Sequence, residues 1–113
     1  MAKLKYQFKL NKLRSICSTG SPLLEESFRY VYKHIKKNVH LSSISGGTDI
    51  VSCFVLGNLY QSVNIGEIQN NGLALDVDVF SDEGRSLKNI KGELVCKNPF
   101  PSMPLKFWND KND

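Results

Sequence analysis

Between residues 13 and 44, the apolar residues change their spacing twice, from strand to helix and back to strand. An apolar-rich run at 13–17 suits a buried strand, and a break rich in turn-forming residues follows it at Ser18–Pro22. A helical stripe comes next, with apolar residues at steps of four and three: Leu24, Phe28, Val31 and Ile35. A second strand is predicted at 39–44. This order is typical of a βα unit that feeds a parallel sheet, so we predict an α/β fold.

The ends of the predicted helix carry signals of their own. Ser21 is a good N-cap, and Pro22 suits the first helical position, where its missing N–H costs nothing. Acidic residues fall in the first turn, at Glu25 and Glu26, and basic residues fall in the last turn, at 33–37. Because this charge order complements the helix dipole, the pattern predicts a helix that starts at Ser21–Pro22.

After Gly57 the pattern indicates strands and turns. A short strand is expected at 65–69, and another at 75–79, where aliphatic residues alternate with two aspartates and so predict one buried and one solvated face. A last strand is expected at 93–96, and the prolines after it exclude a regular helix from the tail. We therefore divide the chain into a βαβ part, residues 1–55, and a β-rich part, residues 56–113.

The net charge is +4 with a pI near 9.0, and much of the positive excess precedes the first acid, Glu25. Charge alone would permit an arm that binds nucleic acid or a membrane, or an organelle presequence. In this region, however, polar residues alternate with apolar ones at Leu4, Tyr6, Phe8 and Leu10. Such spacing favours a solvated strand face, so neither a nucleic-acid partner nor a membrane partner is expected.

Chain length and cysteine content further limit the class of protein. A chain of 113 residues suits a single domain. Its cysteines form no CxxC pair and lie in apolar runs, where a thiol behaves as a small buried hydrophobe: Cys17, Cys53 and Cys96. No apolar run approaches the roughly 18 residues that a membrane span needs. We expect reduced thiols and a cytoplasmic location.

A first candidate site follows the first predicted strand, at the sheet edge where ligands of open α/β folds usually bind. Ser18–Pro22 combines a glycine, hydroxyl groups and the expected helix N-terminus, which together would offer donors to an anion. The plainer alternative is an N-cap followed by a tight turn.

A second candidate site follows the second predicted strand, at Ser45–Asp49. Its two glycines, Gly46 and Gly47, would let a flat or charged ligand approach the backbone. Thr48 offers a hydroxyl to a phosphate oxygen, and Asp49 offers a carboxylate to Mg²⁺. The alternative is a simple turn at a strand end. Neither a GxGxxG fingerprint nor a GxxxxGK[ST] loop is present.

Other polar and aromatic residues have plainer explanations. Strand alternation makes Asp76 and Asp78 a solvated face and not a catalytic pair. His34 lies at a helix end, where it interacts with the dipole, and His40 begins a strand with no nucleophile near it in sequence. Packing is the expected role of the aromatic residues Tyr30, Tyr32, Phe107 and Trp108.

Six motifs follow one another along the chain. They are STGSPL at 18–23, SISGGTDI at 43–50, GEIQ at 66–69, GELVC at 92–96, PFPSMP at 99–104 and FWND at 107–110. In this order they resemble the acetoacetyl-CoA synthetases, which belong to the acyl-adenylate-forming ligases, and the resemblance begins at about Leu10. It implies a βαβ portion of the large N-terminal ligase domain followed by a β-rich subdomain.

The resemblance also implies a reaction and its ligands. Acetoacetate attacks the α-phosphate of Mg·ATP, and the thiol of CoA then displaces AMP to give acetoacetyl-CoA. By the same resemblance Asp49 helps to hold Mg²⁺, although the wider superfamily mostly has Glu there. Residues along the adenine would be Gly20, Ser21 and Pro22. A second nucleotide-contacting stretch would comprise Ser43, Ile44, Ser45, Gly46, Gly47 and Thr48, the last near the α-phosphate.

The chain departs from the family in two respects. Gln61–Ile65 has the sequence QSVNI, where this branch has a proline, an aromatic and a basic residue. The phosphate loop with its lysine, the aspartate that grips the ribose, and the domain with the catalytic lysine fall outside these 113 residues. Because adenylation depends on positioning and charge stabilisation, we expect no turnover by the isolated chain. The remainder of the ligase is a candidate partner, and a non-catalytic binding or scaffold protein is the alternative.

Overall fold

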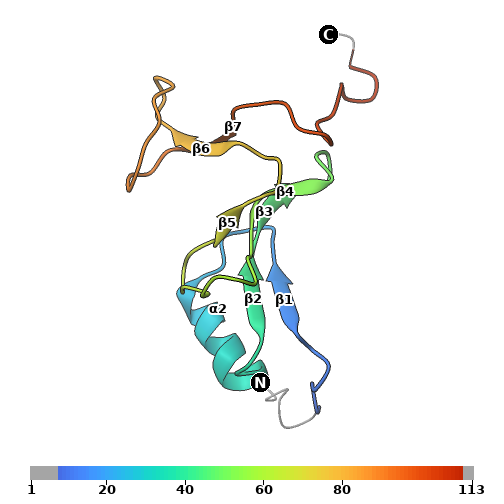
Figure 1. Cartoon of the computed structure of the whole chain (residues 1–113), viewed down its shortest axis with the longest axis vertical. Coiled ribbons are helices and arrows are strands. Elements are labelled where there is room, and N and C mark those ends of the chain that lie inside the picture. Colours follow the sequence, from blue (N-terminus) through green and yellow to red (C-terminus); the bar gives the residue numbers. More distant parts are fainter. Residues whose placement is uncertain (1–7, 111–113) are drawn as a thin grey trace. The chain divides into compact units, whose positions relative to one another are not determined.

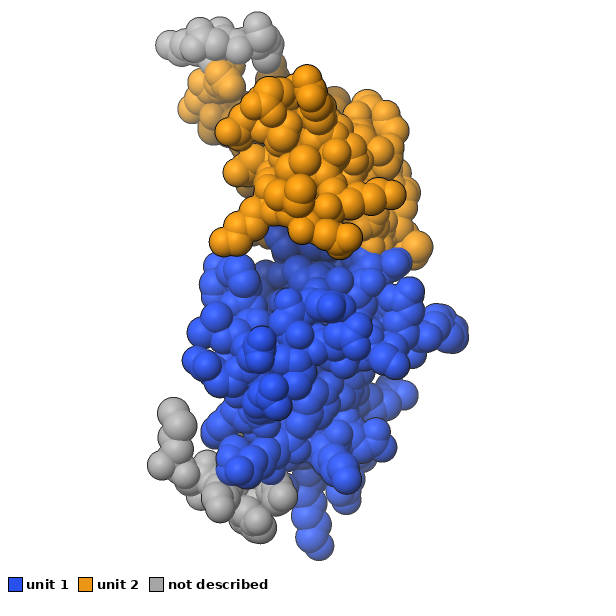
Figure 2. Space-filling model, turned by 90° about the vertical axis from the view of Figure 1, so that its left-hand side faces the viewer, with its two compact units in different colours: residues 1–45, 55–70 blue, residues 46–54, 71–113 orange. Residues whose placement is uncertain are grey.

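The computed structural model describes residues 8–110, and the chain forms two compact units (Figure 2). Unit 1 comprises residues 1–45 and 55–70, and unit 2 comprises residues 46–54 and 71–113. The strand expected at 4–10 lies mostly outside the described residues, and its last part, from Phe8 to Leu10, is in no strand. The assignment of 1–55 and 56–113 to parts of a ligase stays a prediction.

Two parallel strands form the sheet of unit 1, β1 (Ser15–Ser18) and β2 (His40–Ser43). Their register runs from Ser15 opposite His40 to Ser18 opposite Ser43. Figure 1 shows the two strands side by side, and the chain passes between them through a helix. The predicted strand–helix–strand order is therefore confirmed. One detail was wrong, because Cys17 in β1 is exposed and not buried.

The helix consists of α2 (Glu25–Tyr30) and a π-helical turn, η1 (Val31–Ile35), which closes with a hydrogen bond of 3.0 Å from the N–H of Lys36 to the carbonyl of Val31. Its buried face supplies Phe28 and Val31 to the core of unit 1. Strand β2 and the residue before it supply Leu41 and Val39. Phe28 and Leu41 are 0% and 1% exposed, so the predicted helical stripe and second strand do meet in one core.

The predicted start of the helix was wrong. The α-helix begins at Glu25, and the N-cap residue is Leu24, whose backbone is extended and whose side chain caps nothing. Ser21 and Pro22 lie before it in irregular chain. Leu23 packs against the core from this irregular segment, so the chain gains apolar burial before the helix starts. Leu24, which the helical stripe had placed on the buried face, is exposed.

Three further strands form a sheet in the order β3-β4-β5: β3 (Ser45–Gly47), β4 (Ser52–Leu56) and β5 (Asn70–Asn71). The strand expected at 65–69 was wrong, because these residues form a turn and irregular chain. Gly66 has a φ of +82°, which lies outside the extended region, and the N–H of Glu67 bonds back to the carbonyl of Asn64 at 3.3 Å. These two features bend the chain where a strand would need it straight.

In unit 2, β6 (Val77–Phe80) pairs with β7 (Glu93–Cys96) in antiparallel register. Leu75 and Val77 are buried, as the alternating pattern predicted. The tail at 97–110 contains turns and no helix or strand, which confirms the prediction from its prolines. Within residues 8–110, no helix is long and apolar enough to cross a bilayer.

Candidate nucleotide-binding site

The first predicted segment, Ser18–Pro22, starts at the carboxyl end of β1. Gly20 has a φ of +90°, so it makes the left-handed turn that takes the chain out of the strand. Residues 19–22 are exposed. The expected helix N-terminus is absent from this segment, because α2 starts only at Glu25. Any ligand contact here must therefore come from the turn itself and from its hydroxyl groups.

The second predicted segment begins at the carboxyl end of β2. Ser43 is buried and lies opposite Ser18 in the parallel register. The N–H of Ile44 donates a hydrogen bond of 2.9 Å to the carbonyl of Ser18, which extends the pairing one residue further. Within unit 1, the structure therefore brings the start of each predicted segment to the same edge of the sheet.

The rest of the second segment, which belongs to unit 2 from Gly46 onwards, differs from the expected loop. Ser45–Gly47 forms β3, which pairs with β4. A turn follows, closed by a hydrogen bond of 3.1 Å from the N–H of Val51 to the carbonyl of Thr48. A Cβ on Gly46 would overlap the backbone of Ser52 and Cys53, so close strand packing already requires this glycine. Gly47 has nothing within 4 Å of its Cβ position and leaves the backbone open to a ligand.

Asp49 meets the requirements for part of a magnesium site. It is exposed in the turn after β3, and Mg²⁺ in nucleotide sites is commonly held by one or two carboxylates together with phosphate oxygens. Among residues 8–110, no group of three or more His, Cys, Asp or Glu side chains is arranged to hold a metal. Asp49 fits the role of a single protein ligand to a Mg²⁺ ion that arrives with a nucleotide.

A hydrogen bond within unit 1 joins the two ends of the chain segment that carries β3 and β4. The N–H of Gly57, just after β4, donates to the Oγ of Ser42 in β2 at 2.8 Å. Ser42 is 3% exposed, so this bond is shielded from water. No sequence pattern predicts this pair, since fifteen positions separate the two residues.

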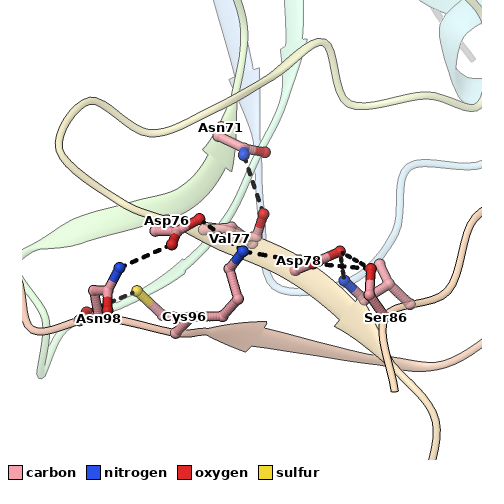
Figure 3. Close-up of polar contacts among 9 residues, drawn as sticks. Asn71, Asp76, Val77, Asp78, Ser86, Cys96 and Asn98 are labelled. Atoms are coloured by element: carbon pink, nitrogen blue, oxygen red, sulfur yellow. Dashed lines mark hydrogen bonds and ion pairs between the residues drawn. The ribbon is translucent and has the colours of Figure 1, made fainter. Parts of the chain in front are cut away.

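A second group of polar side chains lies on the hairpin of unit 2 (Figure 3). The Nζ of Lys97 lies 3.1 Å from Asp76 and 3.6 Å from Asp78. A backbone hydrogen bond from Val79 and a second bond from Ser86 lower the pKa of Asp78, and the bond to Asp76 raises the pKa of Lys97. Lys97 lies against both carboxylates and offsets one of their two negative charges, so the three residues form a structural ion-pair group and not an acid–base pair.

Comparison with known proteins places these segments in a family. No protein-family profile matches the chain. The acetoacetyl-CoA synthetase of Rhizobium meliloti (strain 1021) is 61% identical over 101 residues, which is 89% of this chain and 16% of that protein. The acetoacetyl-CoA synthetase of Gallus gallus is 52% identical over 103 residues, 91% of this chain and 15% of that protein. The chain belongs to the acetoacetyl-CoA synthetase family.

A solved structure supports the same conclusion. The acetoacetyl-CoA synthetase of Streptomyces lividans superposes with a TM-score of 0.81 at 37% identity, over 95% of this chain and 17% of that one. An anthranilate CoA ligase in complex with anthranoyl-AMP superposes with a TM-score of 0.74 at 18% identity, which shows a shared fold alone. The α/β fold class is confirmed. The chain spans about one sixth of the length of the acetoacetyl-CoA synthetases that it matches.

The stretch that departs from the family pattern, Gln61–Ile65, is held by backbone hydrogen bonds at its start and by the side chain of Val63, which packs against the core of unit 1. The carbonyls of Gln61 and Ser62 accept hydrogen bonds of 2.9 and 3.2 Å from the Nε2 of Gln69. Such bonds do not depend on which side chains occupy 61 and 62. The altered side chains at 61 and 62 are therefore compatible with an intact loop.

Proposed function

We propose that this chain is the segment of an ATP-dependent acetoacetate–CoA ligase that lines the adenylate. The complete reaction converts acetoacetate, ATP and CoA to acetoacetyl-CoA, AMP and pyrophosphate. The observation that carries the proposal is the pairing of Ser18 with Ser43, because it sets the starts of the Ser18–Pro22 and Ser43–Thr48 segments at one sheet edge. Ligands of open α/β sheets bind at that edge.

Within the proposal, each segment has its own task. Gly20, Ser21 and Pro22 lie along the adenine, and the exposed backbone at Gly47 with the Thr48 hydroxyl faces the phosphates. Asp49 contributes one ligand to Mg²⁺, which would neutralise phosphate charge when bound. Because Asp is one methylene shorter than Glu, a Glu at this position would reach a differently placed ion.

The proposal also covers the location of the protein and the activity of the isolated chain. Cys17, Cys53 and Cys96 are free thiols, which supports a reducing compartment such as the cytoplasm. The 113 residues alone are proposed to bind nucleotide weakly and to turn nothing over, because the lysines that the family uses on phosphate and acyl groups are not among them. Incubation with acetoacetate, CoA and Mg·ATP should therefore yield no AMP.

A graft tests the catalytic competence of the segment. The matching part of the Rhizobium meliloti acetoacetyl-CoA synthetase is replaced by this chain, and formation of AMP and acetoacetyl-CoA is measured. We expect activity within about tenfold of the parent enzyme. Thr48→Ala or Asp49→Asn in the graft should lower kcat/KM by about a hundredfold, the scale of losing one group that stabilises transition-state charge.

Controls separate this outcome from the non-catalytic alternative. Asp82→Asn changes an exposed carboxylate of the β6–β7 connection and should leave kcat/KM of the graft unchanged. A grafted protein that melts like its parent, binds acetoacetate and CoA, but forms no AMP would favour a non-catalytic binding or scaffold protein.

A further inference from the structure

The side-chain amide of Gln69 makes hydrogen bonds with four residues. Its Oε1 accepts from the N–H of Asn58 at 2.9 Å and lies 2.9 Å from the Nε2 of His40. Its Nε2 donates to the carbonyl of Asn58 at 3.0 Å, and also to the carbonyls of Gln61 and Ser62. One amide thus holds both the residues just after β4 and the first residue of β2.

These partners fix the orientation of the amide and the tautomer of the histidine. Three carbonyl oxygens surround the nitrogen of Gln69, and a carbonyl can only accept, so the amide cannot be flipped. Its Oε1 must therefore accept from His40, and the Nε2 of that imidazole must carry a proton.

The amide lies at the base of the segment that carries the proposed nucleotide contacts. His40 and Ser42 are on β2, before residues 43–56, while Gly57 and Asn58 come directly after those residues. Ser42 bonds to Gly57, and Gln69 joins His40 to Asn58. All of these residues belong to unit 1. These two hydrogen-bonded links, or ties, hold the chain just before residue 43 next to the chain just after residue 56. We call this junction the base of residues 43–56.

We propose that Gln69 is a positioning residue for nucleotide binding, which acts by closing the base of residues 43–56 through His40 and Asn58. It does not touch the nucleotide. When the base opens, a smaller fraction of molecules has the binding-competent form, and the apparent Kd rises by the inverse of that fraction. The inference rests on the proposed function, because it assumes that residues 43–49 bind nucleotide.

The test uses the 113-residue chain with uniform ¹⁵N label. Backbone amide signals report the affinity for Mg·ATP, and amide hydrogen exchange reports the closure of the base at Asn58. Gln69→Ala should expose the Asn58 amide and raise the Kd for Mg·ATP about fivefold, if the closed form falls to about a fifth. Gln61→Ala is the matched control, because it removes an exposed glutamine side chain of the same loop and leaves the backbone carbonyl in place; it should change neither quantity.

Gln69→Glu keeps the acceptor oxygen of the amide and removes its donor nitrogen. A carboxylate still accepts from Asn58 and His40 but cannot donate to the three carbonyls. We expect this variant to expose the Asn58 amide and to weaken Mg·ATP binding at least as far as Gln69→Ala, because its second carboxylate oxygen would face the three carbonyl oxygens that the amide nitrogen now binds. If it instead loses affinity as far as Gln69→Ala while Asn58 stays protected, closure of the base is not what sets the affinity and the inference is wrong.

The remaining outcomes are also decisive. If Gln69→Ala exposes Asn58 but binds Mg·ATP with the wild-type Kd, the amide is only structural and the inference fails while the proposed function stands. If the wild-type chain shows no shifts with Mg·ATP, the proposed function and the inference fail together. Should Gln69→Ala not fold, His40→Ala removes the tie to β2 and should weaken Mg·ATP binding about twofold; an unchanged Kd would contradict the inference.

Discussion

Gly57 packs directly against Ser42, and the N–H of the first donates a hydrogen bond of 2.8 Å to the Oγ of the second. A Cβ at position 57 would overlap that oxygen, the Cβ of the same serine and the ring of His40. Glycine is thus required here by a close approach of backbone to side chain, and not by a turn. The contact holds the chain against β2 just after the end of β4.

Substitution of this glycine tests the contact. Gly57→Ala should lower the free energy of unfolding by about 2 kcal/mol, because an added methyl in a filled space forces its neighbours apart. Urea unfolding followed by circular dichroism measures the change. Gly47→Ala is the matched control, since nothing lies within 4 Å of its Cβ position; its free energy of unfolding should stay within about 0.5 kcal/mol of the wild type. Equal losses in both variants would contradict the role given to Ser42.

The core of unit 1 depends on very few side chains, among which Phe28 is fully buried. Phe28→Ala should cost about 3–5 kcal/mol, from lost apolar burial and the cavity left behind. For a chain of this size that is a large part of the total stability, so thermal melts should show a lost or strongly lowered transition. Leu59→Ala removes an exposed leucine and should leave the melt nearly unchanged.

The sequence predicted the β1–helix–β2 order because apolar spacing records which side chains are buried. Phe28 follows that rule and lies on the predicted helical stripe, and Leu41 lies within the strand predicted at 39–44. Periodicity could not locate the start of the helix, because the burial of Leu23 from irregular chain competes with the capping signal at Ser21. The predicted strand at 65–69 failed for a different reason, since Gly66 and the hydrogen bond from Glu67 to Asn64 form a local turn that the apolar spacing does not reveal.

Only part of the candidate site could be predicted from the sequence. The motif series pointed to the family, which the relatives confirm, and to the edge where Ser18 meets Ser43. The contributions of Gln69 and His40 were missed, because their partners come from distant loops and a lone glutamine carries no spacing signal. Long-range hydrogen bonds of this kind need coordinates.

Lys36 stabilises the turn that precedes β1. Its Nζ donates to the carbonyls of Leu10 and Leu13 at 2.7 and 2.6 Å. Lys36→Met keeps much of the aliphatic side chain but leaves these carbonyls without their charged donor, so we expect a loss of about 1–2 kcal/mol in the free energy of unfolding. Hydrogen exchange should quicken at the amide of Leu13, which bonds to Leu10 in that turn. Lys37→Met, at an exposed position, should change neither measurement.

The ion pairs of unit 2 predict how stability depends on pH. The pKa of Asp78 is lowered in the folded chain, first by the N–H of Val79 and then by Ser86, so its contribution is present above the ordinary aspartate value and is lost as the pH falls through the folded value. The pKa of Lys97 is raised, chiefly by Asp76, so its contribution is present below the ordinary lysine value and is lost as the pH rises through the folded value.

Asp78→Asn isolates the acidic side of this dependence. The variant should be less stable than the wild type at neutral pH. The difference should begin to shrink as the pH falls below the ordinary aspartate pKa of about 4, and it should vanish only below the lowered pKa of the folded chain, where the wild-type carboxylate is protonated as well. Urea midpoints measured from pH 3 to pH 7 test this. Asp82→Asn, at an exposed position of the following turn, should run parallel to the wild type. A constant gap between Asp78→Asn and the wild type at every pH would argue against the ion pair.

The most direct test of the account is a map of the amide shifts that Mg·ATP and AMP cause in the ¹⁵N-labelled chain. Both ligands should shift residues 18–22 and 43–48, and Asp49 and Thr48 should respond further when Mg²⁺ accompanies the triphosphate. Shifts confined to the β6–β7 hairpin, or no shifts at millimolar nucleotide in a folded chain, would contradict it.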